Sequence, residues 1–182
     1  MAGNTEIVSG PRGNPWRMAI WGIAAFLLLL PRVAMQFTSD VNWTLRDFVT
    51  FGAMLLVACG TYELATRLSA NTMYRAAVGV AVVGGFLLVW MTLAVGIIES
   101  EADSANLMFG GVLLVGAIGA IIARFQPRGM ARALIATAIA QGLVAVIAVI
   151  GGFGGRPLWL LTPFYVAVWL VSAALFRKAA RE

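Results

Sequence analysis

The sequence predicts an all-α membrane protein, built as a bundle of six transmembrane helices. Of its 182 residues, 61% are hydrophobic and only 12% are charged, about half of the ~25% charged residues found in soluble domains. Six apolar segments also approach the ~20 residues that a helix needs to cross a bilayer. So few charged side chains cannot cover a water-facing surface of ordinary size, and we expect most of the exterior to face lipid.

The six predicted spans occupy residues of about 17–37, 47–66, 76–98, 107–124, 133–153 and 158–176. Residues 1–16 and 177–182 form short polar tails, and the connections between spans are too short to fold into a catalytic domain. The first residues are too polar for a cleavable signal peptide, and no cleavage site follows the first apolar run. We therefore expect one multi-pass membrane domain and no separate soluble domain.

The distribution of lysine and arginine predicts the orientation in the membrane. One set of span ends carries ten of the thirteen basic residues, namely Arg12, Arg17, Arg67, Arg75, Arg124, Arg128, Arg132, Arg177, Lys178 and Arg181. Because basic residues favour the cytoplasmic side, this side and both termini are predicted to be cytoplasmic. The basic residues are spread over short loops without a recognition motif, so we do not expect nucleic acid as a partner.

The first span contains Pro31 and Arg32 close to its outer end. At 1.5 Å per residue, Arg32 lies roughly 8 Å from the end of the span at residue 37, a depth from which a long side chain reaches the interface. One interpretation is an interface anchor, or an ion pair with a nearby acid such as Asp40 or Asp47. The other is a charge that lines an outward-facing cavity.

Local patterns mark both ends of the second span. In "VNWTLRDF", Thr44 and Asp47 have the spacing of a capping box, with aspartate in place of the usual glutamate. In "YELATR", Glu63 precedes Arg67 by four residues, so the two side chains share a helix face and can pair. The pair favours an interfacial salt bridge, and a carboxylate that couples ion movement is the alternative.

The connection after the third span, "ESEADSAN", is the most acidic stretch of the chain. Its alternating carboxylates, Glu99, Glu101 and Asp103, would lie on one side of an extended chain and could hold a hard cation. The spacing matches no calcium motif, however, and a tight loop would need a glycine that is absent. A solvated acidic loop is the favoured interpretation, and a cation site is the alternative.

Gln141 is the most deeply placed strongly polar side chain, near the middle of the fifth span. In lipid such a group needs a partner, which predicts either a hydrogen bond between helices or a contact with a transported solute. Small residues recur along one face of the fourth span, at Gly116, Ala120 and Ala123, and similar faces occur in spans three and five. They predict a tight bundle, since small residues let helices approach closely.

The second and fourth spans begin alike, with "FGAMLLV" from Phe51 and "FGGVLLV" from Phe109. Further along, Arg75 and Arg132 fall in the same register, after a gap of one residue. The match predicts a parallel repeat of helical hairpins. Span six is a candidate third copy, with span one as its displaced partner, and the two-copy version remains the simpler alternative.

Four strings, "VNWTLRDF", "YELATR", "NLMFGG" and "ARFQPRGMARAL", resemble an uncharacterised group of small bacterial multi-pass membrane proteins. The resemblance covers nearly the whole chain. It implies a location in the bacterial inner membrane and implies no activity, because none is attached to that group.

Catalytic residues are not evident, and we do not expect an enzyme. The chain has no histidine and one cysteine, Cys59, so no nucleophile–base pair, metal site or cofactor site is predicted. The favoured function is an accessory or assembly subunit that binds another membrane protein or forms a homo-oligomer in the bilayer. The alternative is a transporter or channel for a small solute or ion that uses Glu63, Gln141 and Arg32. Glu99 is a further candidate for partner contact.

Overall fold

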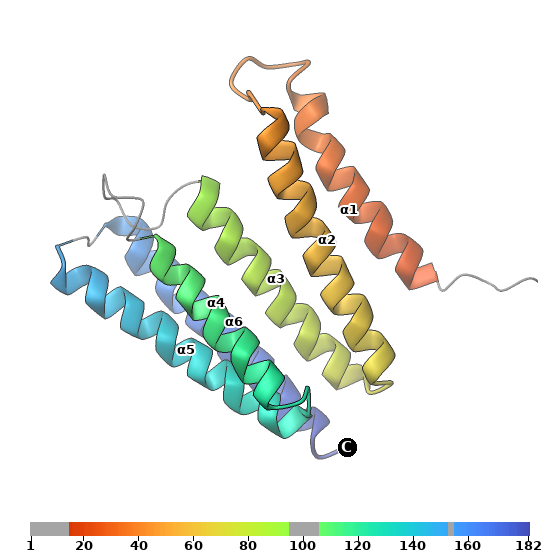
Figure 1. The fold of residues 1–182 in the computed structure, drawn as a ribbon, viewed down its shortest axis with the longest axis vertical. Helices are drawn as coiled ribbons and strands as arrows, with labels where there is room; N and C mark the ends of the chain where they lie inside the picture. The colour runs from red at the N-terminus through yellow and green to blue at the C-terminus, as the bar shows by residue number, and fades with distance from the viewer. Residues whose placement is uncertain (1–14, 95–105, 153–154) are drawn as a thin grey trace, which may run out of the picture. The chain divides into compact units, whose positions relative to one another are not determined.

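The computed structural model describes residues 15–94, 106–152 and 155–182, and all the regular structure within these ranges is α-helical. The helices are α1 (Pro15–Ala34), α2 (Leu45–Leu68), α3 (Thr72–Ala94), α4 (Leu107–Ile122), α5 (Pro127–Ile150) and α6 (Arg156–Ala179) (Figure 1). Five of these helices are long and apolar enough to cross a membrane, and α4 is a shorter apolar helix of 16 residues. The predicted all-α fold with six helices is confirmed.

The chain forms two compact units. The first unit extends to Cys59, and the second runs from Gly60 to Glu182, so that the boundary falls within α2. In the first unit, α1 and the beginning of α2 run in opposite directions (Figure 1). Leu28 lies against Gly52, where its Cδ1 would be 3.7 Å from a Cβ atom. Most of the large apolar side chains of α1 are exposed, and Ala24, Phe51 and Leu55 supply the buried apolar residues of this unit.

Thr44 and Asp47, the two residues of the predicted capping box, form the N-terminal cap of α2. The backbone N–H of Thr44 donates to Oδ2 of Asp47 at 2.7 Å, which is the carboxylate half of a capping box. The Thr44 hydroxyl donates to the same oxygen at 2.8 Å, instead of accepting a bond from the Asp47 amide. The Trp43 ring packs edge-on against Phe48 at 5.2 Å and Phe51 at 5.4 Å. This contact between the residue before the cap and the fourth helical residue is a hydrophobic staple.

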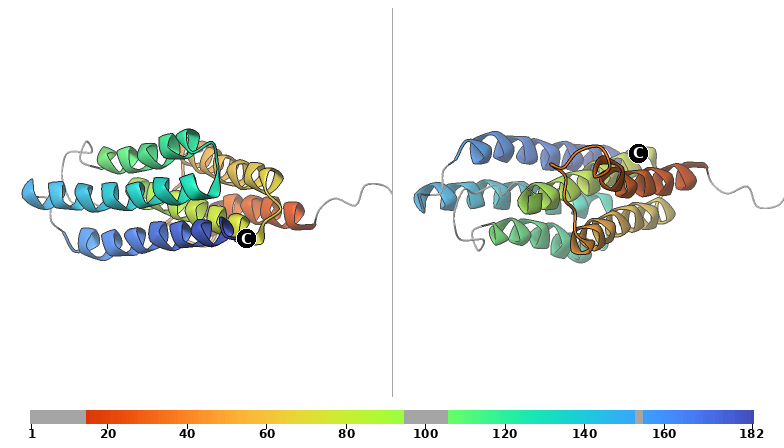
Figure 2. Two further views of the ribbon diagram at one scale, coloured as in Figure 1. Left: turned by 90° about the horizontal axis from the view of Figure 1, so that it is seen from below. Right: turned by 90° about the horizontal axis from the view of Figure 1, so that it is seen from above.

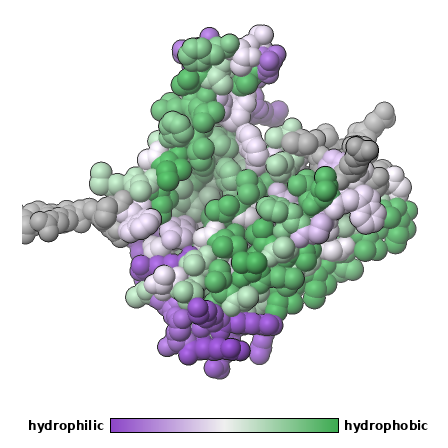
Figure 3. Space-filling view, turned by 180° about the vertical axis from the view of Figure 1, so that it is seen from behind, coloured by the Kyte–Doolittle hydropathy of each residue, from purple (hydrophilic) through white to green (hydrophobic). Residues whose placement is uncertain are grey.

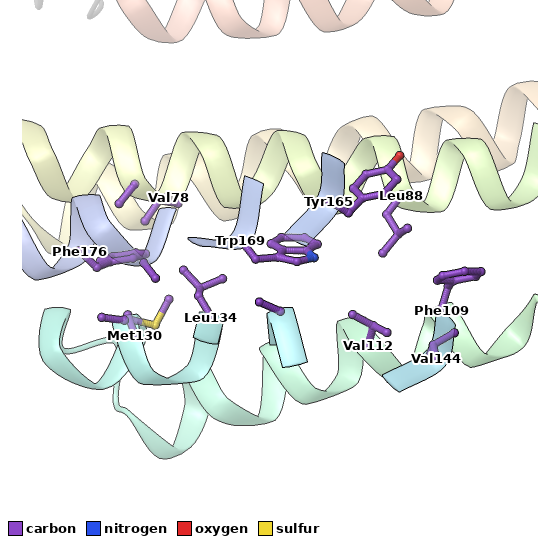
Figure 4. Close-up of a cluster of buried hydrophobic side chains, with 14 of the residues drawn as sticks. Val78, Leu88, Phe109, Val112, Met130, Leu134, Val144, Tyr165, Trp169 and Phe176 are labelled. Atoms are coloured by element: carbon purple, nitrogen blue, oxygen red, sulfur yellow. The ribbon is translucent and has the colours of Figure 1, made fainter. Parts of the chain in front are cut away.

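The second unit is held together mainly by α5 and α6. Helix α5 lies between α4 and α6, and α6 also packs along α3 (Figure 2). Their apolar side chains meet in one core, where Trp169, Tyr165 and Phe176 of α6 face residues of the other three helices (Figure 4). Each of these three rings is at most 2% exposed. The core therefore follows α6 along most of its length.

Glycine allows the closest helix contacts in this unit. A Cβ atom at Gly119 would lie 2.7 Å from Cβ of Ala133, and one at Gly84 would lie 2.6 Å from Cγ1 of Val168. A Cβ atom at Gly116 would likewise lie 3.1 Å from the hydroxyl oxygen of Thr137. The small-residue face predicted on the fourth span is thus used inside the chain, where it brings α4 against α5.

The connections at one end of the second unit are rigidly hydrogen-bonded. The Asn71 side chain accepts a bond from the Tyr74 amide at 2.9 Å and so caps α3. Arg75 donates to the carbonyls of Ser69 (2.9 Å) and Thr66 (3.0 Å), which helps to satisfy the free carbonyls at the end of α2. Helix α5 begins at Pro127, ahead of the apolar segment predicted from residue 133, because proline suits the first helical position.

The two helix pairs of the predicted repeat pack differently. Helix α4 packs closely along α5, whereas α2 and α3 make far fewer close contacts. The connections also differ, since Asn71 caps α3 but no side chain caps α5. A common origin of the two hairpins stays a prediction.

We expect Gly119→Ala to lower the melting temperature in mild detergent, because its Cβ atom would collide with Ala133 and push α4 away from α5. Gly142→Ala is the matched control, since nothing lies within 4 Å of a Cβ atom at that helical position. It should leave the melting temperature unchanged or slightly raised. Equal effects of the two substitutions would contradict the importance of the α4–α5 contact.

Candidate functional site

Arg32 lies in the last turn of α1 and is exposed. The helix ends at Ala34, so Arg32 is closer to the end of its helix than the predicted span suggested. Within the described residues it forms no ion pair with Asp40 or Asp47. Both features favour an interface anchor over the predicted ion pair.

Glu63 and Arg67 form the salt bridge that their spacing predicted. The Glu63 side chain is 15% exposed and the Arg67 side chain is 66% exposed, so the carboxylate lies mostly inside and the guanidinium reaches outward. The contact joins Oε1 of Glu63 to an Nη atom of Arg67. Glu63 therefore has a local partner one helical turn away, as expected for an interfacial ion pair.

Gln141 is enclosed in the bundle, with 1% of its surface exposed. Its Oε1 atom has no hydrogen-bond partner among the described residues, and the same is true of Trp169 Nε1 and Thr162 Oγ1. The other two buried polar side chains are satisfied: Ser172 donates to the carbonyl of Ala77 at 2.7 Å, and Thr137 to that of Ala133 at 2.9 Å. Ser172 thus forms a hydrogen bond between α6 and α3, whereas the helix–helix bond or solute contact expected of Gln141 stays a prediction.

The acidic stretch with Glu99, Glu101 and Asp103 lies outside the described residues. Within the described ranges, no group of three or more cysteine, aspartate or glutamate side chains is placed to hold a metal ion. The cation site at this loop stays a prediction.

A cavity of about 290 Å³ opens on the side of the second unit, and we call it the lateral cavity. It lies where α3 and α4 approach without extensive packing, and the end of α2, the start of α5 and Trp169 complete its lining. The lining is almost entirely apolar. Of its three hydroxyl groups, on Thr61, Tyr74 and Thr137, the last two donate to backbone carbonyls, and no charged side chain lines it.

The lateral cavity ends at an unusual backbone conformation. Arg124 and Phe125, between α4 and α5, both have positive φ angles, 49° and 58°. A left-handed conformation at a residue other than glycine costs of order 1–3 kcal/mol. The Tyr74 hydroxyl donates to the Phe125 carbonyl at 2.9 Å and the Tyr74 ring packs against Phe176 at 5.2 Å, which holds this corner in place. Neither Arg124 nor Phe125 carries a sequence signal for such a turn, so the sequence analysis missed it.

Basic residues gather at the same end of the second unit, which we call the basic end. Figure 3 shows the largest group of hydrophilic residues at the bottom of the view and apolar residues along the side. The basic side chains in this region are Arg67, Arg75, Arg124, Arg128, Arg132, Arg177, Lys178 and Arg181. The described carboxylate side chains of the second unit are Glu63, bound to Arg67, and Glu182, which accepts a bond from Asn71. The basic end therefore carries a large positive excess.

No protein-family model, curated protein or solved structure matches the chain, so the function is inferred from its own residues.

We expect Gln141→Leu to raise the free energy of unfolding by about 1 kcal/mol, because it removes a buried oxygen without a partner and keeps the volume. Thermal unfolding in mild detergent measures the change. Gln141→Ala removes the same oxygen but leaves a cavity, so it should be less stable than Gln141→Leu. A large loss of stability in Gln141→Leu would instead indicate a bound polar partner.

The Glu63–Arg67 pair should respond asymmetrically to substitution. Glu63→Gln leaves an arginine that water can solvate, so the loss should be about 0.5 kcal/mol. Arg67→Gln leaves a mostly buried carboxylate without its cationic partner, and the loss should be larger, about 1–3 kcal/mol. Unfolding of both variants under identical detergent conditions tests this order. Equal losses would contradict the burial difference between the two groups.

Proposed function

We propose that the chain is a non-enzymatic accessory or assembly subunit of a complex in the bacterial inner membrane, with both termini in the cytoplasm. It binds another membrane protein through lipid-facing helix surfaces. The orientation rests on the excess of basic residues at one end, since such residues favour the cytoplasmic side. The bacterial location rests on the resemblance of the four sequence strings.

The observation that carries this proposal is an open small-residue surface on α4. Gly110 and Gly111 are exposed, and nothing lies within 4 Å of a Cβ atom at either position. Exposed Leu114 and Ile118 continue this surface along the helix. In lipid, helices associate by close van der Waals packing at small residues, because the hydrophobic effect does not drive them together. A second helix can therefore approach α4 here more closely than elsewhere.

The small number of charged groups available inside the bundle supports the same function. Glu63 is paired with Arg67, and the lateral cavity has an apolar lining without charged side chains. A pathway for ions or polar solutes usually needs polar groups near the middle of the bilayer.

One observation favours transport as a second candidate. The buried Oε1 of Gln141 and Nε1 of Trp169 are an acceptor and a donor without partners. A polar solute passing through the bundle could satisfy both atoms. This candidate keeps Glu63 as the group that couples ion movement and Arg32 as a charge at the outer entrance.

The test is extraction from the native membrane in mild detergent, followed by native mass spectrometry. Wild type should carry a second membrane protein in fixed stoichiometry. Gly110→Leu combined with Gly111→Leu should lose that protein without unfolding, because both positions are open. Gly22→Leu is the matched control, since its Cβ position in α1 is equally open, and it should retain the partner.

A chain that purifies without a different protein would overturn the accessory function. Reconstitution into liposomes then tests transport directly. Flux that is abolished by Glu63→Gln or Gln141→Leu, with folding intact, would establish the second candidate.

A further inference from the structure

The lateral cavity has the length of one bilayer leaflet. Along α3 its lining extends from Tyr74 at the basic end to Gly85, eleven residues or about 16 Å. The hydrocarbon core of a bilayer is about 30 Å thick, so the cavity reaches from one membrane surface to about the midplane. Trp169 contributes to its lining, and its ring lies close to Gly84 and Gly85, where larger side chains would intrude.

The dimensions of the lateral cavity favour a chain over a helix as its occupant. The volume of the cavity is about 290 Å³. A helix with its side chains is about 10–12 Å in diameter and would need far more space. A single acyl chain, by contrast, is narrow and apolar throughout. The apolar lining offers such a chain van der Waals contacts, and it offers a polar solute only two side-chain groups without a described partner, the Thr61 hydroxyl and Nε1 of Trp169.

The basic end supplies charge beside the opening of the cavity. Phe125 lines the cavity and is 42% exposed, and Arg124 precedes it in the turn. Arg128 is exposed in the first turn of α5, but it is two residues from Met130 of the lining and so projects from the opposite face of the helix. Arg67 and Arg75 are engaged with Glu63 and with backbone carbonyls. Arg124 and Arg128 form no ion pair within the described part of the chain and remain able to bind an anion.

We propose that the lateral cavity binds one acyl chain of an anionic phospholipid, whose headgroup phosphate lies at the basic end against Arg124. Transfer of an acyl chain from the bilayer into an apolar cavity gains little hydrophobic free energy, because lipid tails are equally apolar. Selection therefore has to come from the headgroup. Basic pockets between transmembrane helices are suited to anionic headgroups on the cytoplasmic side.

The charge beside the cavity and the space inside it can be removed independently. Arg124→Gln removes the charge beside the cavity. Ala117→Phe fills the cavity from α4, because Ala117 is an exposed residue of its lining. Arg177→Gln removes the same charge from the basic end, outside the cavity lining. Ile122→Phe adds a similar ring to α4 at an exposed position outside that lining.

The experiment titrates the purified full-length chain in mild detergent with phosphatidylglycerol or phosphatidylcholine of the same acyl chains. Native mass spectrometry counts bound lipid, and the melting temperature reports its effect on folding. Wild type should bind one phosphatidylglycerol more tightly than phosphatidylcholine. Arg124→Gln should bind it about fivefold more weakly, since a basic residue near an anionic surface contributes ~1 kcal/mol.

The pattern across the variants decides the outcome. Ala117→Phe should lower the binding of both lipids, whereas the two control variants should match wild type. Equal binding of phosphatidylglycerol and phosphatidylcholine to wild type would overturn the headgroup assignment. Undiminished binding to a folded Ala117→Phe, or an equal loss in the Arg177→Gln control, would overturn the site. Arg124→Lys keeps the charge and should retain the selectivity for phosphatidylglycerol, and loss of that selectivity would also overturn the headgroup assignment.

Discussion

The close contact between α4 and α5 is the constraint on which the second unit depends. The two helices approach until Gly119 has no room for a side chain beside Ala133. In lipid this proximity has to come from shape, since lipid tails solvate apolar side chains as well as another helix does. The same contact leaves α4 loosely packed against α3. The bundle is therefore tight on one side of α4 and open on the other, which is where the lateral cavity lies.

Tyr74 joins three parts of this arrangement. Its ring packs against Phe176 of α6, its hydroxyl holds the Phe125 carbonyl, and its amide is capped by Asn71. The turn between α4 and α5 is thereby fixed in a conformation that its residues do not favour by themselves. A tyrosine at a membrane boundary is usually attributed to its amphipathic ring. Here its hydrogen bond also decides how Phe125 is presented at the edge of the cavity.

Local physics explains which features could be predicted from the sequence. Long apolar runs can be stable in a membrane only as helices, because the backbone must satisfy its own hydrogen bonds there. Spacing along one helix likewise placed Thr44 beside Asp47 and Glu63 beside Arg67. Contacts between helices carry no such short-range signal. The positive φ angles at Arg124 and Phe125, the cavity beside them and the enclosure of Gln141 arise from tertiary packing, so the sequence predicted only that Gln141 needs a partner.

The length of α4 has a consequence for the membrane itself. A helix of 16 residues is about 24 Å long, which is less than the hydrocarbon thickness of a typical bilayer, about 30 Å. For α4 to cross, the adjacent lipids have to thin locally, at a cost of fractions of a kcal/mol per Å of hydrophobic mismatch. The neighbouring helices, at 23 or 24 residues, impose no such deformation. The chain would then be asymmetric in its preferred bilayer thickness, and short-chain lipids would accumulate beside α4.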